Sequence, residues 1–439
     1  MAVAITSIAD SVLSMAPMHP GHRCPQRGSL TRRTLLSVPA LAITLLLGAC
    51  SASETTTPST QPIETFSPTA SVASFYHGPS PLPSAPPGTV IRTQLIKNVD
   101  GIPPETSSYR VLYHSTSLDG RDMTESGMIL VPSQAPPPGG YPIVSWAHGT
   151  TGAADPCAPS ILESNSMPYL SRFLSAGFIV AETDYDGLGT PGIHPYLVGQ
   201  SEGRSVLDAA RAARHLVGPQ ASNKVVLFGH SQGGHAALFA GQEAKSYSPE
   251  LHVAGLVSVA PVGSLTDLVP ATPPTTYVAG QPYAVLASIV WSQLYPDVQL
   301  SKVLTPAGES LRHLVDEKCI GDLIAATAGS SASQLFQPHW SQAPGMASAI
   351  ARNSPGNAPI AVPILLVQGH QDEIVTPTST NAIDERLCAQ GDTVQYHIYL
   401  SHNHGSVTQE AEGDIVTWIR DRFAGGAPQS NCGTAPTAH

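Results

Sequence analysis

The chain contains 439 residues, of which 41% are hydrophobic and only 12% charged, and its formal net charge is −11. These proportions allow a large buried core and exclude a chain that is disordered throughout. The acidic balance argues against a nucleic-acid partner, because phosphate binding needs a basic surface.

The first 50 residues carry the pattern of a bacterial export signal. Arg32 and Arg33 stand before an apolar run over 35–47, and Gly48, Ala49 and Cys50 follow it. Small residues ahead of a cysteine resemble a lipobox, and the paired arginines resemble a twin-arginine signal. We therefore expect an exported protein that is lipidated at Cys50 and faces outward on the cell membrane, or that is secreted. A plain transmembrane anchor is disfavoured, because a span needs about 18 apolar residues.

Residues 51–90 are rich in Ser, Thr and Pro and show no apolar periodicity, which predicts a disordered tether. Beyond Cys50, the cysteines that remain are Cys157, Cys319, Cys388 and Cys432. An even number of cysteines in an oxidising compartment predicts two disulfides. Their spacing leaves all three pairings open.

Short apolar segments alternate with amphipathic ones from about residue 88. Two early antiparallel strands are expected over 109–115 and 127–131, and a buried parallel strand over 141–146. Further strands are expected over 178–183, 225–228, 254–259, 364–367 and 394–400, and amphipathic helices over 206–217 and 407–418. This alternation predicts an α/β fold, with a mostly parallel sheet and helices on both faces.

The alternation fails over 262–358, which we interpret as an inserted, mainly helical cap. The segment carries six aromatic residues that are candidates for lining a pocket: Tyr277, Tyr283, Trp291, Tyr295, Phe336 and Trp340. The alternative is a helical spacer whose aromatic side chains pack inward as an ordinary core.

The motif Gly229-His230-Ser231-Gln232-Gly233 stands where an apolar strand meets an Ala-rich helical stretch. This arrangement is typical of a nucleophile elbow, in which larger flanking side chains would clash around a strained serine. We expect Ser231 to be the nucleophile. The backbone N–H of Gln232, at a helix N-terminus, is then one oxyanion donor. A chance match in a chain rich in Gly and Ser is less favoured, given the strand before and the helix after.

A nucleophilic serine needs a base and a carboxylate that orients it. Asp372 follows the strand predicted over 364–367 and is the expected acid, with the adjacent Glu373 as the alternative. His404 precedes the last helix and is the expected base, with His402 as the alternative.

Other roles for histidines are less favoured. A metal alternative would group His370, Asp372, His402 and His404, but it lacks a recognised ligand signature, so we expect no metal. The other candidate bases are His148, His194, His230 and His235. They precede Asp372, against the order Ser, acid, His that accompanies this elbow.

A second oxyanion donor is expected from the loop after the strand over 141–146. That loop begins with His148-Gly149, and the N–H of Thr150 is the preferred donor, with Thr151 as the alternative. A purely structural turn at His148-Gly149 is the competing interpretation.

Together with the elbow, these motifs resemble the secretory lipase family of α/β hydrolases, the fungal lipase A type, over residues 90–425. The motifs are Trp146-Ala147-His148-Gly149-Thr150, Asp155-Pro156-Cys157-Ala158-Pro159-Ser160, Asp184-Tyr185-Asp186-Gly187-Leu188-Gly189, His194-Pro195-Tyr196-Leu197 and Gly369-His370-Gln371-Asp372. The resemblance implies an α/β-hydrolase fold with a cap, and hydrolysis of carboxylic esters, including triacylglycerols. It also implies the pairs Cys157–Cys319 and Cys388–Cys432. The chain differs from many members of this family in two features, which are Gln232 directly after the nucleophile and the lipoprotein leader.

The predicted reaction is acyl transfer to water through an acyl-enzyme on Ser231, with no metal or organic cofactor. A transacylase or polyester hydrolase on the same triad is the alternative, and a non-catalytic surface binding protein is less favoured. The expected domains are a signal over 1–50, a tether over 51–90, a catalytic domain over 91–261 and 359–425, a cap over 262–358 and a tail over 426–439.

Overall fold

A computed structural model of the chain describes residues 62–439, apart from 68–70, 98, 100 and 163–168. The predicted signal, Cys50 and the first part of the predicted tether lie outside the described residues. Within the described ranges, no helix combines the length and apolar character that crossing a membrane requires.

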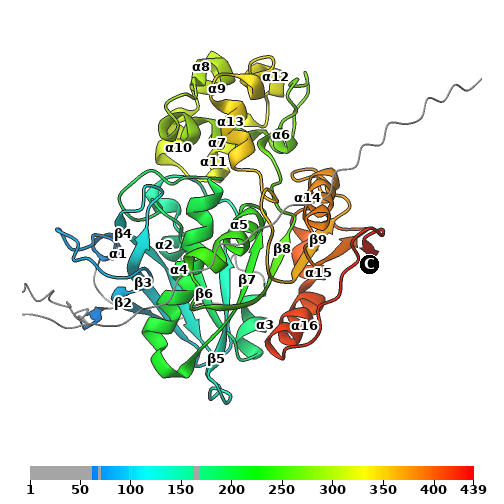
Figure 1. Cartoon of the computed structure of the whole chain (residues 1–439). Coiled ribbons are helices and arrows are strands. Elements are labelled where there is room, and N and C mark those ends of the chain that lie inside the picture. Colours follow the sequence, from blue (N-terminus) through cyan, green and yellow to red (C-terminus); the bar gives the residue numbers. More distant parts are fainter. Residues whose placement is uncertain (1–61, 68–70, 98, 100, 163–168) are drawn as a thin grey trace, which may run out of the picture. The chain divides into compact units, whose positions relative to one another are not determined.

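Among the described residues, eleven strands form one sheet in the order β1-β2-β3-β4-β6-β5-β7-β8-β9-β10-β11 (Figure 1). The strands are β1 (Glu64–Phe66), β2 (Val90–Ile96), β3 (Ser107–Thr116), β4 (Asp122–Val131), β5 (Tyr141–Ala147), β6 (Ile179–Thr183), β7 (Ala221–His230), β8 (His252–Val259), β9 (Ile364–Gly369), β10 (Val394–Tyr399) and β11 (Thr437–Ala438). The pairs β2–β3, β3–β4 and β4–β6 are antiparallel. The other neighbours are parallel, so the predicted α/β class with a mostly parallel sheet is confirmed.

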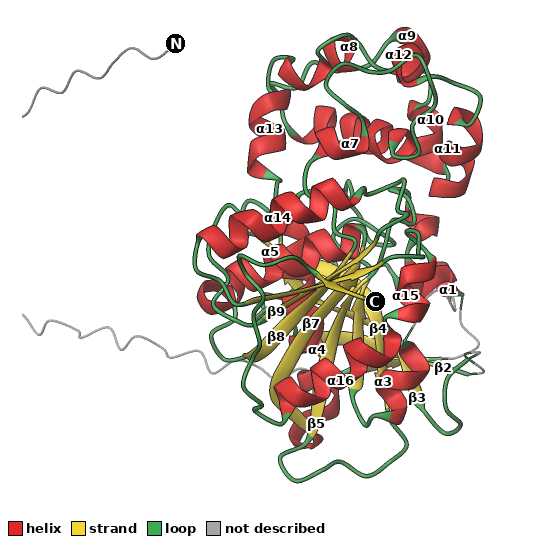
Figure 2. Ribbon diagram, turned by 90° about the vertical axis from the view of Figure 1, so that its right-hand side faces the viewer, coloured by secondary structure: helices red, strands yellow, loops and turns green. Residues whose placement is uncertain are grey.

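Helices cover both faces of this sheet (Figure 2). One face packs against α4 (Gly199–Val217), α5 (Gln232–Tyr247) and α14 (Pro377–Ala389). The other packs against α3 (Leu170–Ser175), α15 (Ser406–Glu410) and α16 (Glu412–Phe423). The central parallel strands are apolar along their length because both of their faces are buried. The helix predicted over 407–418 is two helices, although Val407, Ala411, Ile415 and Trp418 are buried on one side as the periodicity indicated.

The segment predicted as a cap consists of short helices around a third apolar cluster. They are α6 (Leu265–Leu268), α7 (Gln281–Leu294), α8 (Leu300–Val303), α9 (Pro306–Glu309), α10 (Arg312–Glu317), α11 (Ile320–Thr327), α12 (Ala332–Leu335) and α13 (Met346–Arg352). Figure 1 shows these helices gathered together at one end of the sheet. The cluster also includes Tyr196, Leu197 and Val375, which belong to the loops that follow sheet strands.

The prediction of a disordered tether over 51–90 is wrong for its described part. Strand β1 pairs with β2, and the short helix α1 (Val72–Phe75) buries Phe75 completely. The hydroxyl of Tyr76 lies 2.7 Å from Oγ of Ser160, just inside α2 (Pro159–Leu162). The Ser, Thr and Pro content of the whole segment concealed a few aromatic residues that are sufficient to dock its second half on the sheet.

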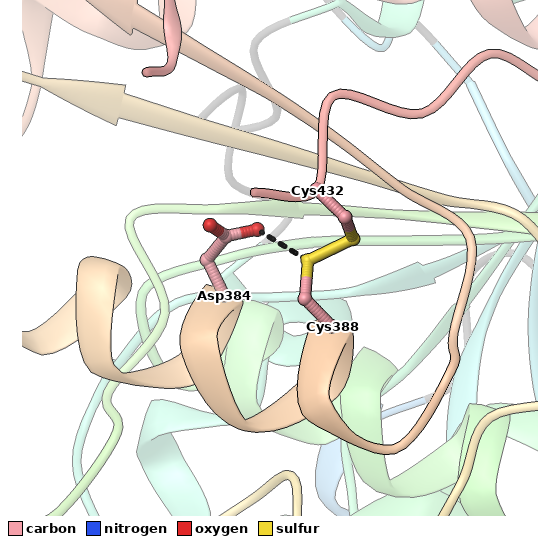
Figure 3. Close-up of side chains that lie close together, drawn as sticks. All are labelled: Asp384, Cys388 and Cys432. Atoms are coloured by element: carbon pink, nitrogen blue, oxygen red, sulfur yellow. Dashed lines mark hydrogen bonds between the residues drawn. A yellow bond between two sulfur atoms is a disulfide. The ribbon is translucent and has the colours of Figure 1, made fainter. Parts of the chain in front are cut away.

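The segment predicted as a C-terminal tail, 426–439, adds the edge strand β11 to the sheet. A disulfide between Cys388 of α14 and Cys432 fixes this segment (Figure 3). Asp384, one turn before Cys388 on the same helix, places Oδ1 3.5 Å from its Sγ. Burial, followed by the nearby Glu385, raises the pKa of Asp384 to about 6.

Candidate active site

Ser231 occupies a sharp turn between β7 and α5, with φ 60° and ψ −118°. A side chain at Gly229 would overlap the carbonyl of Gly233, and one at Gly233 would overlap the carbonyl of Ala147. The serine N–H donates to the carbonyl of Val259 at 2.9 Å, which fixes the turn against the next strand. Such a positive φ is strained for a residue with a Cβ. The local geometry therefore has the features expected of a nucleophile elbow.

Asp372 and His404 form a hydrogen-bonded pair at the ends of β9 and β10. Nδ1 of His404 lies 2.7 Å from Oδ2 of Asp372, and the carboxylate is almost fully buried. Its other oxygen, Oδ1, accepts the N–H groups of Ile374 and Val375, both at 2.9 Å. With Nδ1 donating to the carboxylate, Nε2 of His404 is the nitrogen that remains free to act as a base.

The alternative acid and base lie elsewhere. Glu373 is exposed, whereas its neighbour Asp372 points inward. His402 faces the exposed Glu410, with 3.8 Å between Nε2 and Oε2. The structure thus brings together Asp372 and His404, and it separates the two alternatives from them.

Ser231 and His404 line one cavity of about 450 Å³, together with Thr150, Thr151 and Tyr283. Among the described residues, no hydrogen bond joins Oγ of Ser231 to His404. The two residues are related because both line this cavity. Its volume is in the range of small-molecule sites.

The two proposed oxyanion donors lie next to residues that line this cavity. The N–H of Gln232 belongs to the first turn of α5, where backbone N–H groups have no partner within the helix. Thr150 and Thr151 both line the cavity, so the choice of Thr150 as the second donor stays a prediction. The Thr150 hydroxyl lies 2.8 Å from the hydroxyl of Tyr196.

A buried polar network lies behind the elbow, and the sequence analysis missed it. Nε2 of the Gln232 side chain donates to Oε1 of Glu202 on α4 at 2.8 Å, and Nδ1 of His235 lies 2.8 Å from Oε2 of the same carboxylate. Nε2 of His235 lies 2.9 Å from the carbonyl of Asn353, directly after α13. The network therefore connects the residue that follows the nucleophile to the end of the cap. The sequence signal that could have revealed this network was Glu202, a charged residue among mostly small residues at the start of a largely buried helix.

The histidines that precede Asp372 have other partners in this region. Nε2 of His230 lies 2.9 Å from the backbone carbonyl of His404, and burial lowers the pKa of His230 well below its usual range. A neutral His230 that donates through Nε2 supports the backbone of His404. Burial also lowers the pKa of His194 to about 4, and that of His148. His148 lies beneath the Gly149 turn, with Nδ1 2.6 Å from its carbonyl.

The cap reaches the cavity through only a few residues. A disulfide joins Cys157, near the predicted oxyanion loop, to Cys319 at the start of α11, and the N–H of Ile320 donates to the carbonyl of Thr151 at 2.8 Å. This pair and Cys388–Cys432 are the two that the resemblance implied. Cys319, Ile320 and Tyr283 line the cavity.

The expectation that the cap aromatics form a pocket wall requires correction. Trp291, Phe336 and Trp340 are buried in the apolar cluster of the cap itself. The indole N–H of Trp291 donates to the carbonyl of Tyr196 at 2.9 Å, and Tyr277 is exposed. Of the six aromatic residues, Tyr283 alone is among the cavity-lining side chains of the described chain. These aromatic side chains pack with the leucine, isoleucine and valine side chains of the same cluster, so they form the core of the cap instead of a pocket wall.

Two groups of side chains among the described residues have atoms close enough to share a metal ion. One contains Asp384, Cys388 and Cys432, but both sulfurs are committed to a disulfide. The other contains His397, Asp414 and His439, at the edge strand β11. Neither group includes the residues of the metal alternative around Asp372 and His404.

The mostly parallel sheet, the elbow after β7 and the acid–histidine pair after β9 and β10 define an α/β hydrolase. The sequence matches the secretory lipase family over residues 159–431, and the chain belongs to that family of carboxylic ester hydrolases. It is 26% identical to a "probable inactive lipase" of Mycobacterium tuberculosis over 80% of this chain and 82% of that protein. It is also 26% identical to a secreted triacylglycerol lipase of Malassezia globosa, over 80% of this chain and 79% of that protein.

Solved structures share the fold. Lipase A of Candida antarctica in its closed state aligns with a TM-score of 0.71 at 19% identity, covering 83% of this chain and 88% of that one. The rice cell wall degrading esterase LipA of Xanthomonas oryzae aligns with a TM-score of 0.64 at 22% identity, covering 78% of this chain and 99% of that one.

Proposed function

We propose that this protein hydrolyses lipid esters through a covalent acyl-enzyme on Ser231, with His404 as general base and Asp372 as the residue that orients it. The observation that carries the proposal is the hydrogen bond of 2.7 Å between His404 and the buried Asp372, beside a cavity that His404 and Ser231 both line. The strained turn at Ser231 supports the same assignment, because it places this cavity-lining serine at the N-terminus of α5.

The reaction follows from these positions. Nε2 of His404 takes the proton of Ser231 as Oγ attacks the ester carbonyl, and Asp372 stabilises the resulting imidazolium. The N–H groups of Gln232 and Thr150 hold the oxyanion. His404 then gives the proton to the departing alcohol, and a water activated by the same histidine releases the acid.

The substrate range is proposed from the cavity and the relatives. Trp146, Leu162 and Ile320 provide apolar walls that suit an acyl chain. The relative from Malassezia globosa is named as a triacylglycerol lipase, and we propose the same broad class of lipid ester here. A transacylase or polyester hydrolase would use the same triad, and these activities differ in the acceptor or in the ester that is cleaved.

The domain limits are part of the proposal. We assign residues 91–261 and 359–425 to the catalytic domain, and 262–358 to the cap.

We further propose export and lipidation at Cys50, with the lipid anchor holding the enzyme on the outer side of the cell membrane. Metabolic labelling with a fatty-acid analogue tests the anchor. Labelling that persists in Cys50→Ser contradicts it.

The deciding experiment is hydrolysis of p-nitrophenyl esters of increasing chain length by the purified protein, with Ser231→Ala as the control. The first relative is named a probable inactive lipase, so a non-catalytic binding protein is the second candidate. Turnover that Ser231→Ala abolishes supports the proposed reaction. No turnover of any ester, with intact folding, would favour the binding protein.

A further inference from the structure

Glu182 is a buried acid at the active-site cavity that the proposed reaction does not use. It is the sole charged residue of β6, it is 1% exposed, and it lines the cavity that Ser231 and His404 share. Within the described part of the chain, its Oε2 atom has no hydrogen-bond partner. A buried polar atom without a partner is rare in native proteins and calls for a specific explanation.

The surroundings of Glu182 are apolar. It pairs in register with Met128 of β4 on one side and with Trp146 of β5 on the other. Directly paired residues of neighbouring strands point to the same face of a sheet, so the carboxyl stands between these two side chains. Val180, two residues earlier in β6, shares this face.

The apolar surroundings favour the neutral form of the carboxyl. Burial, followed by the nearby Asp184, raises the pKa of Glu182 well above its usual value. A neutral carboxyl donates one hydrogen bond through its O–H and accepts others through its oxygens. The group is therefore complementary to a hydroxyl, which also donates and accepts.

Asp184, two residues further along the chain, shows what a structural acid looks like in this fold. It is also fully buried, but Oδ2 accepts the hydroxyl of Ser126 at 2.6 Å, and Oδ1 accepts the N–H of Ser160 at 2.8 Å. The hydroxyl of Ser160 bonds the same carboxylate. Asp184 thereby ties β4 and α2 to the end of β6. Glu182 makes no such connection, so holding strands or helices together does not account for it.

The register places Glu182 further from the carboxyl ends of the strands than the nucleophile. Glu182 aligns with Trp146, and Trp146 aligns with Phe228, three residues before Ser231. In an acyl-enzyme the acyl group stays attached to the serine, while the alcohol departs. A polar group along the inner wall is therefore placed to meet the acyl part of the substrate, at some distance from its carbonyl carbon.

We propose that Glu182 is a specificity-determining residue that hydrogen-bonds a hydroxyl on the acyl chain, so that the enzyme prefers esters of hydroxy acids to esters of plain alkanoic acids. This inference rests on the proposed function, because it needs an acyl group on Ser231. The unpaired Oε2 is then the atom that the substrate satisfies. An alkanoyl chain in the same place leaves it unpaired, which penalises binding of that chain.

The test compares p-nitrophenyl esters of one chain length, one without a hydroxyl and a series with the hydroxyl moved along the acyl chain. We expect kcat/KM of wild type to be about tenfold or more higher for one hydroxyl position than for the plain ester. Glu182→Met should bring the ratio of kcat/KM for the hydroxy ester over the plain ester to one or below. Glu182→Gln should retain part of the preference, because an amide also donates and accepts. Met128→Leu is the matched control, since Met128 borders Glu182 but does not line the cavity, and its ratio should equal that of wild type.

Several results would overturn the inference. One is a wild-type kcat/KM ratio near one at every position of the acyl hydroxyl. Another is an equal loss of kcat/KM on both esters in Glu182→Met. A third is a preference that depends on a hydroxyl in the alcohol part of the ester. If Glu182→Met does not fold, as its thermal melting shows, Glu182→Gln decides the question by its ratio. Wild type that cleaves neither ester refutes the proposed function, whereas cleavage of both with no effect of Glu182 on the ratio refutes this inference alone.

Discussion

The α/β core and the cap contribute unequally to the candidate site. The core supplies Ser231, Asp372 and His404 from the ends of three parallel strands, each held by backbone or buried side-chain bonds. The cap supplies Tyr283, Cys319 and Ile320 to the cavity, and it keeps its largest aromatic side chains for its own interior. From this difference we expect the sheet to determine the chemistry and the cap to act on substrate selection through a small contact area.

Two of the contacts that join these regions lie close to the candidate site. The Cys157–Cys319 disulfide connects the cap to the loop region beside the predicted oxyanion donors. Asn353, at the other end of the cap, contacts His235, which in turn bonds Glu202. Changes in the core should therefore alter turnover, and changes in the cap should alter stability or the preference among substrates.

Ser231→Ala should have the largest effect, because the attacking oxygen is lost. We expect ester hydrolysis to fall by about a millionfold, to the level of the oxyanion site alone. Initial rates on a short and a long p-nitrophenyl ester measure the loss, and circular dichroism checks the fold. A variant with near wild-type rates would refute the elbow assignment and, with it, the view that the core carries the chemistry.

Asp372→Asn should lower kcat by about ten-thousandfold, because an asparagine favours the wrong tautomer of His404. The matched control is Glu373→Gln, which changes the adjacent, exposed acid. Its kcat should stay within a few-fold of wild type. If the control proves the more damaging change, Glu373 is the acid, and the pair at 2.7 Å is structural.

Trp291→Ala should destabilise the protein by about 3–5 kcal/mol through the cavity it leaves in the cap and the lost indole hydrogen bond to Tyr196. Denaturant unfolding measures the loss. At temperatures where the variant remains folded, its preference among acyl chain lengths should match that of wild type. A changed chain-length profile with normal stability would mean that Trp291 contacts the substrate after all.

Glu202→Gln tests whether the core controls turnover through residues that never touch the substrate. The glutamate holds the side chain of Gln232, whose N–H is a proposed oxyanion donor, so kcat should fall by about ten- to a hundredfold with little change in KM. Glu243→Gln is the control, because Glu243 also links α5 to α4, through Arg204, but away from the elbow. Parallel losses in both variants would assign Glu202 a purely structural role.

The sequence predicted best those features that have a local signature. The glycines around Ser231 and the apolar central strands specify the elbow and the sheet through short-range sterics and burial. The edge strands β1 and β11 were missed, since each is short and gains its stability from a partner elsewhere in the chain, and the neighbouring strand β2 was missed as well. Glu202 and Glu182 were missed for a related reason. Whether a buried acid has a partner depends on contacts across helices or strands, which no spacing along the chain reveals.

Tyr283→Ala should have the smallest effect and is the sharpest test of the cap. Tyr283 and Trp291 lie on the same helix, α7, yet Tyr283 lines the cavity and Trp291 does not. Removing the ring deletes an apolar contact worth about 1–3 kcal/mol, and only acyl chains long enough to reach it make that contact. The ratio of kcat/KM for long over short esters should therefore shift several-fold, in contrast to Trp291→Ala. An equal change on all chain lengths would indicate that the cap, like the core, acts on turnover, and the division between the two regions would fail.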